Sequence, residues 1–295
     1  MDRCGALVDV EWLSQHLHDA SVRVVDVRWF LPFTGRSARA EYREGHIPGA
    51  TLVDLDHELA AHGGGSGGRH PLPEPEAFAS TLGKHGIDPT CHVVAYDDSA
   101  GSTAARLWWM LRQIGHRNVS VLDGGLAAWR ATGKPLETEE AHDRAAATYP
   151  VVPFGAFGTI IARDAILSAV DAGALLIDAR APERFEGTSE PMDPRAGHIP
   201  GARNLPFAGN VISDAAGISR FLSPETLRER FVRAGVTSES PVILSCGSGV
   251  TACHNALAMH LAGFDAPAVY VGSWSDWSSQ PHLPIETGPS VGPRG

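Results

Sequence analysis

The sequence has few of the features that mark a secreted, membrane or metal-binding protein. Its 295 residues include four cysteines, at positions 4, 91, 246 and 253, without the paired spacing of a metal site or the pattern of a secreted disulfide framework. No apolar run approaches the roughly 20 residues that a membrane span needs. The first residues, 1–12, lack the apolar core of a signal peptide. We therefore expect a cytoplasmic protein that holds no metal ion.

Positive charge is scarce as well. The chain has 24 lysine and arginine residues against 34 aspartate and glutamate residues, which gives a formal net charge of -10. An acidic surface does not favour nucleic acid or an anionic membrane as the main partner, and we expect neither. A local group of basic residues could still bind a small anion.

One six-residue segment occurs twice. Gly-His-Ile-Pro-Gly-Ala occupies positions 45–50 and again 197–202. Two flanking segments repeat with a similar offset of about 150 residues, 24–28 with 176–180 and 123–129 with 271–277. Solenoid repeats have much shorter periods. The repetition therefore predicts two homologous domains, 5–135 and 160–288, joined by a linker over 136–159.

Each half has the same order of short apolar runs and helical stretches. The runs are predicted to be strands and lie at Val93–Tyr96, Val119–Leu122, Val242–Ser245 and Ala268–Val271. Strands that alternate with helices are typical of a parallel sheet that is covered by helices on both faces. We therefore predict an α/β fold with one such sheet in each domain.

Cys246 has the most informative surroundings in the chain. It follows the predicted strand 242–245 and opens a loop of small residues, 246–251, before a helix-like stretch over 252–261. A helix N-terminus and a ring of backbone N–H groups favour an anionic sulfur. Ligands of parallel sheets bind at the carboxyl ends of the strands. These features predict that Cys246 is a nucleophile.

The doubled segment, the Trp108-Trp109 pair and the Cys246 loop together resemble the tandem-domain rhodanese family of sulfurtransferases. The resemblance extends over about residues 8–287. It implies two rhodanese-like domains, of which the second is catalytic and the first is silent. Counting back from the following helix puts Asp98 opposite Cys246, and an aspartate cannot carry sulfane sulfur.

The loop resembles in particular that of 3-mercaptopyruvate sulfurtransferases. Thiosulfate-preferring relatives usually carry basic residues just after the cysteine, where this chain has Gly247 and Ser248. A loop without cations suits a monoanionic thiol-keto acid better than a dianion. The resemblance therefore favours 3-mercaptopyruvate as the sulfur donor, and thiosulfate remains the alternative.

The resemblance also implies the chemistry. Cys246 attacks the donor sulfur and becomes a persulfide, which the backbone N–H groups of Gly247, Gly249 and Val250 stabilise. The sulfur then passes to cyanide, a small thiol or thioredoxin. Because the persulfide is the carrier, no cofactor is expected. A persulfide carrier or binding module that serves a partner protein would use the same cysteine, so this alternative remains open.

Further site residues follow from the same resemblance. Arg184 matches the family arginine that grips the donor anion, and a guanidinium fork suits a carboxylate. Arg195 is a second candidate, although the corresponding family arginine lies farther ahead of the repeated segment. Asp56 and His70 match first-domain positions that face the active site in mercaptopyruvate enzymes.

The loop also carries two hydroxyls, Ser248 and Thr251. Ser248 could relay a proton when the donor C–S bond breaks, and either hydroxyl could instead cap the loop and helix. The residues that recur in both halves are predicted to be structural: Asp26 with Arg28, Asp178 with Arg180, and the two histidines, His46 and His198. Cys253, inside the predicted helix, is predicted to be a core cysteine.

Two other enzyme classes fit the Cys246 loop poorly. A phosphatase of similar fold needs an arginine six residues after the cysteine, and that position is Ala252. Residues 247–252 match a dinucleotide-binding fingerprint, but the next strand ends at 271–273 without the acidic residue that the fingerprint requires.

Overall fold

The structure is a computed structural model that describes residues 5–61, 67–139 and 146–290. The chain forms two compact units, and neither is one continuous stretch of sequence. Unit 1 comprises Met1–His62, Pro73–Ala156 and Ile212–Phe221, and unit 2 comprises Gly63–Leu72, Phe157–Val211 and Leu222–Gly295. Cys4 and part of the predicted linker, 140–145, lie outside the described residues, so the contiguous domain boundaries stay a prediction.

Unit 1 contains a parallel sheet of five strands in the order β1-β5-β4-β2-β3. The strands are Leu7–Val8 (β1), Val22–Asp26 (β2), Thr51–Leu52 (β3), His92–Tyr96 (β4) and Val119–Leu122 (β5). The two central strands, β4 and β2, are nearly continuous apolar runs, which is what a strand buried on both faces requires.

Unit 2 repeats this order with four strands, β11-β10-β6-β7. They are Leu175–Asp178 (β6), Arg203–Asn204 (β7), Val242–Ser245 (β10) and Ala268–Val269 (β11). Ile160 forms a parallel bridge to Val269, in the place where β1 pairs with β5. β11 is shorter than predicted because the chain leaves the sheet to meet the Cys246 loop, where the Trp274 N–H donates to the Cys246 carbonyl at 3.0 Å.

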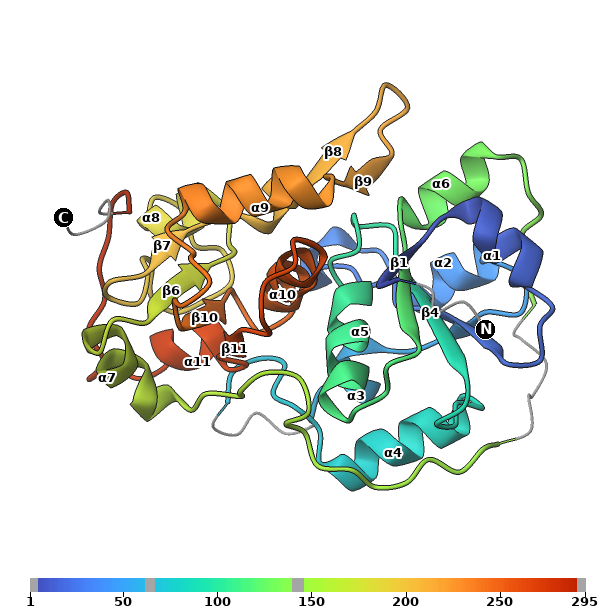
Figure 1. Cartoon of the computed structure of the whole chain (residues 1–295), viewed down its shortest axis with the longest axis horizontal. Helices are drawn as coiled ribbons and strands as arrows, with labels where there is room; N and C mark the ends of the chain where they lie inside the picture. The colour runs from blue at the N-terminus through green and yellow to red at the C-terminus, as the bar shows by residue number, and fades with distance from the viewer. Residues whose placement is uncertain (1–4, 62–66, 140–145, 291–295) are drawn as a thin grey trace. The chain divides into compact units, whose positions relative to one another are not determined.

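Helices cover both faces of each sheet. In unit 1 they are Val10–His16 (α1), Ala38–Glu44 (α2), Leu55–Glu58 (α3), Pro75–Lys84 (α4), Ala104–Gln113 (α5) and Gly125–Ala131 (α6), with a 3₁₀ turn at Pro32–Thr34 (η1). Leu13 of α1 and Trp129 of α6 pack with Val94 of β4 in one core. Figure 1 shows α5 on the other side of β4. The predicted two-sided parallel sheet is confirmed.

In unit 2 the helices are Ile166–Asp171 (α7), Pro182–Glu186 (α8), Pro224–Arg233 (α9), Thr251–Leu261 (α10) and Ser273–Ser278 (α11), with 3₁₀ turns at Arg163–Ala165 (η2) and Phe207–Asn210 (η3). Phe185 and Trp277 pack with Ile243 of β10. Figure 1 shows α9 and α7 on opposite sides of β6 and β10. α9 begins where the Ser223 hydroxyl accepts from the Thr226 N–H and Pro224 fills the first turn.

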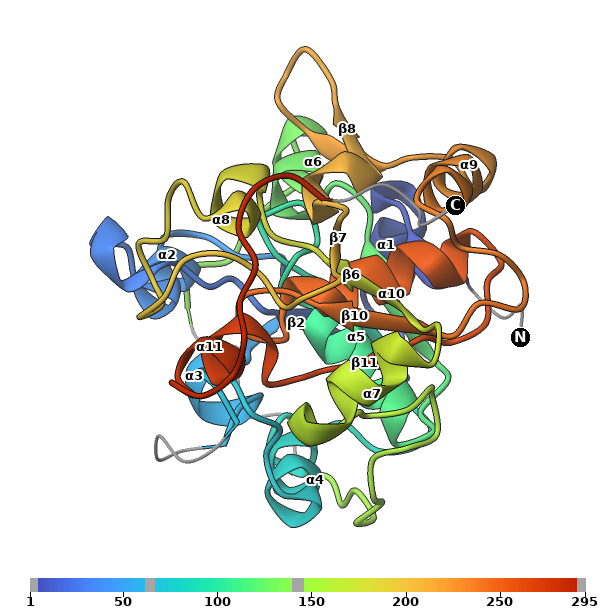
Figure 2. The ribbon, with the colours of Figure 1, turned by 90° about the vertical axis from the view of Figure 1, so that its left-hand side faces the viewer.

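A short hairpin from the second half of the sequence belongs mostly to unit 1. Its strands are Val211–Ser213 (β8) and Ser219–Phe221 (β9). The Phe221 N–H donates to Asp123 at 2.9 Å, and Ile218 is part of the unit 1 core. Figure 1 and Figure 2 both show the hairpin beside α6.

The same buried ion pair joins the repeated segments in both units. Arg28 donates to Asp26 at 2.7 Å and to the Gly45 carbonyl at 3.0 Å. Arg180 repeats this, donating to Asp178 at 2.8 Å and to the Gly197 carbonyl at 2.7 Å.

The repeated histidines are structural as well. Each is buried, and its Nδ1 lies 2.8 Å from a backbone carbonyl, that of Tyr42 for His46 and that of Phe185 for His198. The structural roles predicted for both residue pairs and for both histidines are confirmed.

Replacing Arg28 should lower the free energy of unfolding far more than replacing an exposed arginine of the same unit. Arg28→Ala leaves the buried Asp26 carboxylate without its cation, and breaking such a pair costs about 3–5 kcal/mol. Arg36→Ala breaks ion pairs with Glu41 and Asp98, in which the arginine side chain is 48% exposed, and should cost about 1 kcal/mol. Urea unfolding of the two variants measures this difference, and equal losses of stability would contradict it.

Candidate active site

Cys246 lies where a catalytic thiol was predicted, directly after β10 at the carboxyl end of a central strand. Its side chain is buried, and the residue is only 1% exposed. The Gly249 N–H donates to its sulfur at 3.1 Å. α10 then begins at Thr251, with Val250 in the N-cap position. Sγ therefore receives a backbone N–H from the loop that leads into a helix.

Gly249 allows the loop to turn back on Cys246. Its φ is +80°, and a β-carbon at this position would lie 2.3 Å from the Val271 carbonyl oxygen. Only glycine has both the conformational freedom and the small size that this position requires. The Cys253 thiol, buried in α10, donates to the Gly249 carbonyl at 3.2 Å, and Cys253 is a core cysteine as predicted.

Ser273 is a site residue that the sequence did not reveal. Its hydroxyl accepts the Cys246 N–H at 3.0 Å and donates to the Tyr270 carbonyl at 2.9 Å. Its φ is +51°, an uncommon value for a residue with a side chain, and such strain occurs often at functional sites. The signal was present in the repeat, because Ser273 stands where unit 1 has Gly125, whose φ is +56°.

Unit 1 holds a carboxylate in the place of the thiol, but not the predicted one. Tyr96 pairs with Asp26 in the sheet as Ser245 pairs with Asp178. The next residue, Asp97, therefore corresponds to Cys246, and the prediction of Asp98 was wrong. The error arose because the unit 1 loop is one residue longer than the Cys246 loop. Counting back from the following helix therefore ended one residue too late, at Asp98.

The Asp97 carboxylate collects the N–H groups of its loop. One oxygen accepts from Ser99 and Gly101 at 2.8 Å, and the other accepts from Thr103 and Ala104 at 2.9 Å. Backbone N–H groups that converge in this way form an anion-binding nest. In unit 1 the loop N–H groups bind a side-chain carboxylate, and in unit 2 the Gly249 N–H binds the Cys246 sulfur.

Ser248 and His70 are in contact, although they are far apart in the sequence. The Ser248 hydroxyl lies 2.7 Å from Nδ1 of His70, and both residues are buried. His70 comes from the segment Gly63–Leu72, which belongs to unit 2. An imidazole beside a hydroxyl next to the nucleophile can pass a proton to or from a bound molecule.

Arg184 lies in the short helix α8, beside two buried acids. It donates to Glu190 at 2.7 Å and to Asp193 at 3.1 Å, and both carboxylate side chains are only 2% exposed. Arg180 also reaches Glu190, at 3.3 Å. Burial raises the pKa of Asp193, although the neighbouring arginines act in the opposite direction. The acids hold the Arg184 guanidinium in one position.

The guanidinium of Arg184 borders the Cys246 loop, as does that of Arg69. A β-carbon at Gly247 would lie 3.3 Å from Nη1 of Arg184 and 3.2 Å from Nη2 of Arg69. The loop itself carries no cation, as the sequence shows, but two cations from other segments stand beside its first residue. Arg69 was not among the predicted residues, because nothing in its local sequence marks it.

The contacts of two more predicted residues lie within their own units. Arg195 donates to the backbone carbonyls at the end of α11 and just beyond it, namely those of Trp277, Ser278, Gln280 and Leu283. These contacts favour a structural role for Arg195 over the predicted grip on a carboxylate. Asp56 is an exposed residue of α3 in unit 1, where it accepts from the Trp29 indole N–H at 2.9 Å.

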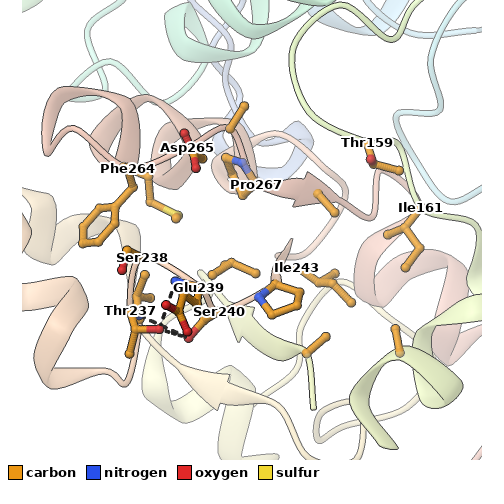
Figure 3. Close-up of a pocket in the computed structure, with 18 of the residues that line it drawn as sticks. Thr159, Ile161, Thr237, Ser238, Glu239, Ser240, Ile243, Phe264, Asp265 and Pro267 are labelled. Carbon is orange, nitrogen blue, oxygen red and sulfur yellow. Dashed lines mark hydrogen bonds between the residues drawn. The ribbon is translucent and has the colours of Figure 1, made fainter. Parts of the chain in front are cut away.

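A pocket of unit 2 lies at the amino ends of β10 and β11. The pocket measures about 520 Å³ and is lined by the amino end of β10, including Ile243, and by residues that follow α10, including Phe264 (Figure 3). None of the predicted site residues lines it. Within the described ranges, no cluster of three His, Cys, Asp or Glu side chains could hold a metal ion, and no helix could cross a membrane.

Comparison with known proteins identifies the family of the chain. The model of the rhodanese-like domain matches residues 9–132 and 163–280. A Pseudomonas aeruginosa protein named "Probable 3-mercaptopyruvate sulfurtransferase" is 43% identical, over 96% of this chain and 98% of its own. The "Thiosulfate/3-mercaptopyruvate sulfurtransferase 2" of Arabidopsis thaliana is 36% identical, over 95% and 86%. The structure of 3-mercaptopyruvate sulfurtransferase from Leishmania major matches with a TM-score of 0.81 and 31% identity, over 95% and 76%.

Gly249→Ala should damage the loop beyond the ordinary cost of losing a glycine. Gly173 is the matched control, because its φ is +99° and a β-carbon there would meet nothing within 4 Å. Gly173→Ala should cost about 1–2 kcal/mol. Gly249→Ala should cost about 1–3 kcal/mol more, because its methyl group clashes with Val271. Urea unfolding and the iodoacetamide labelling rate of Cys246 test this; equal behaviour of the two variants would contradict it.

Proposed function

The chain belongs to the rhodanese family, and from this premise we propose that it is a sulfurtransferase that takes sulfur from 3-mercaptopyruvate through a persulfide on Cys246. The observation that carries the proposal is the buried Cys246 sulfur, which accepts the Gly249 N–H inside an anion-binding loop. The corresponding group of unit 1 is a carboxylate, so only unit 2 can form a persulfide at this position.

The first half-reaction moves one sulfur atom. The Cys246 thiolate attacks the donor sulfur, an S–S bond forms, and the C–S bond breaks with its electron pair on the donor carbon. That carbon takes up a proton and leaves as the methyl group of pyruvate, while the thiol proton of the donor is lost. The product is an anionic persulfide on Cys246, which the loop N–H groups stabilise as they stabilise the thiolate.

Ser248 and His70 supply the route for the proton. The donor thiol must lose a proton, and the departing carbon must gain one. The Ser248 hydroxyl, two residues from the nucleophile and 2.7 Å from the imidazole, can carry the proton between these sites. Thr251, at the start of α10, belongs to the loop that surrounds the sulfur.

The second half-reaction returns the enzyme to its thiolate. Cyanide attacks the outer sulfur, the S–S bond breaks, and thiocyanate leaves with Cys246 regenerated as the thiolate. A small thiol or thioredoxin takes the sulfur in the same way. The carrier is the cysteine itself, so the reaction needs no cofactor or metal. A reducing compartment such as the cytoplasm keeps the thiol available.

Thiosulfate is the second candidate donor, and one observation favours it. The Arg184 and Arg69 guanidiniums stand beside Gly247, where they could offset the charge of a dianion. Glu190 and Asp193 pair with these arginines, however, and reduce the net positive charge available to a dianion. The balance therefore favours the monoanionic keto acid.

Steady-state sulfur transfer to cyanide tests the proposal. We expect a higher kcat/KM for 3-mercaptopyruvate than for thiosulfate. Cys246→Ser should lower turnover by about 10⁴-fold or more, because the nucleophile is lost. A preference for thiosulfate would overturn the donor assignment but keep the nucleophile. Absence of turnover with either donor would instead favour a persulfide carrier that serves a partner protein.

Arg184→Ala should raise KM for 3-mercaptopyruvate by about 10- to 100-fold, the range expected for a lost hydrogen bond between charged groups. Arg184→Lys keeps the charge but not the forked guanidinium. Its KM for 3-mercaptopyruvate should lie between those of Arg184→Ala and the wild type. Arg228→Ala, an arginine of the pocket at the amino ends of β10 and β11, serves as the control. Unchanged kinetics in Arg184→Ala would remove this residue from the donor site.

A further inference from the structure

Arg69 lies beside the Cys246 loop, although it belongs to a distant segment of the sequence. The repeat between the two halves gives no sign of this contact. Its Nη2 would lie 3.2 Å from a β-carbon at Gly247, on which Nη1 of Arg184 also converges at 3.3 Å. Gly247 directly follows the nucleophile. Two guanidiniums from different segments therefore meet beside the residue next to Cys246.

The backbone and side chain of Arg69 are both held in place. Its N–H donates to the Ser275 hydroxyl at 3.0 Å. Its Nη1 forms an ion pair with Asp193, a carboxylate that is 2% exposed. The other oxygen of the same carboxylate accepts from Arg184 at 3.1 Å. Asp193 thus bridges the two arginines and sets the spacing between them.

Each arginine keeps a donor group available on the side that faces Gly247. In the part of the chain that the structure describes, Nη2 of Arg69 and Nη1 of Arg184 form no hydrogen bond. The side chains are 29% and 22% exposed, so a small molecule can reach them. Two unused donors at one place suit a ligand with two acceptor oxygens.

The acids beside the two arginines define what kind of anion fits. Arg69 and Arg184 contribute +2 and Glu190 and Asp193 contribute −2, so this group has no net charge. The site therefore offers directed N–H donors without a strong positive field. A planar monoanion such as a carboxylate uses the donors fully, whereas a dianion lacks the second charge that it needs.

We propose that Arg69 is the second carboxylate-binding residue of the donor site, and that the donor carboxylate is held between Arg69 and Arg184. The inference rests on the proposed function, whose sulfur donor carries that carboxylate. The contacts of Arg195 are consistent with it, because Arg195 is bound to four backbone carbonyls. The segment just before residues 197–202 instead contains Asp193, which forms the ion pair with Arg69.

The test compares two donors that differ only in the carboxylate. They are 3-mercaptopyruvate and mercaptoacetone, a thiol ketone with a methyl group in place of the carboxylate. Arg69→Ala should raise KM for 3-mercaptopyruvate roughly tenfold or more, as expected for a lost charged hydrogen bond. Its kcat/KM for mercaptoacetone should stay near the wild-type value. The KM of Arg69→Lys for 3-mercaptopyruvate should lie between those of Arg69→Ala and the wild type. This variant can be measured if Arg69→Ala fails to fold.

Arg163→Ala is the matched control. Arg163 is 30% exposed and pairs with a buried aspartate, Asp276, as Arg69 pairs with Asp193. This variant should leave the KM of both donors unchanged. The double variant Arg69→Ala/Asp193→Asn also removes the negative charge of Asp193, which Arg69→Ala leaves paired with Arg184 alone, and its KM for 3-mercaptopyruvate should remain raised.

Four outcomes would overturn the inference. Equal losses with both donors in Arg69→Ala would mean that Arg69 acts on the fold of the site. A wild-type KM in the double variant would mean that Arg69 serves only to neutralise Asp193. If the wild type is active and Arg69→Ala leaves the KM for 3-mercaptopyruvate unchanged, the role of Arg69 is refuted and the proposed function stands. A wild-type chain inactive with every donor would refute the proposed function, and the role of Arg69 with it.

Discussion

A tight loop that directs backbone N–H groups at a buried side chain requires an electron-rich group at its centre. In unit 1 that group is the Asp97 carboxylate, which accepts four backbone N–H groups. In unit 2 it is the Cys246 sulfur. The same loop type therefore accommodates a carboxylate in unit 1 and, in the function that we propose, a thiolate and its persulfide in unit 2.

The surroundings of the loop follow from this constraint. Gly249 has to approach the Val271 carbonyl, and Ser273 takes a strained conformation that brings its hydroxyl to the Cys246 N–H. Arg180 lies nearby in a buried ion pair. Burial opposes its charge, but Asp178, Glu190 and Cys246 together raise the pKa of Arg180. A permanent cation near the sulfur complements the anionic forms that the loop stabilises.

The sequence predicted the sheets, and it placed Cys246 at the end of a central strand, because both depend on local pattern. The apolar run Val242–Ser245 is a strand with the predicted bounds. Arg69 and Ser273 escaped prediction because their contacts depend on where the chain leaves the sheet and returns to it. Asp98 was chosen over Asp97 because counting assumed loops of equal length, whereas strand pairing fixes the register.

The segment assignment of the chain has a consequence for its modularity. Residues Gly63–Leu72 precede the second half of the sequence but belong to unit 2, where His70 meets Ser248 and Arg69 meets Asp193. In return, Ile212–Phe221 belongs to unit 1 and places Ile218 in its core. The two homologous halves are therefore no longer interchangeable parts. A gene fusion or recombination that inherited one half alone would carry an incomplete core or an incomplete site, which ties the halves together as one evolutionary unit.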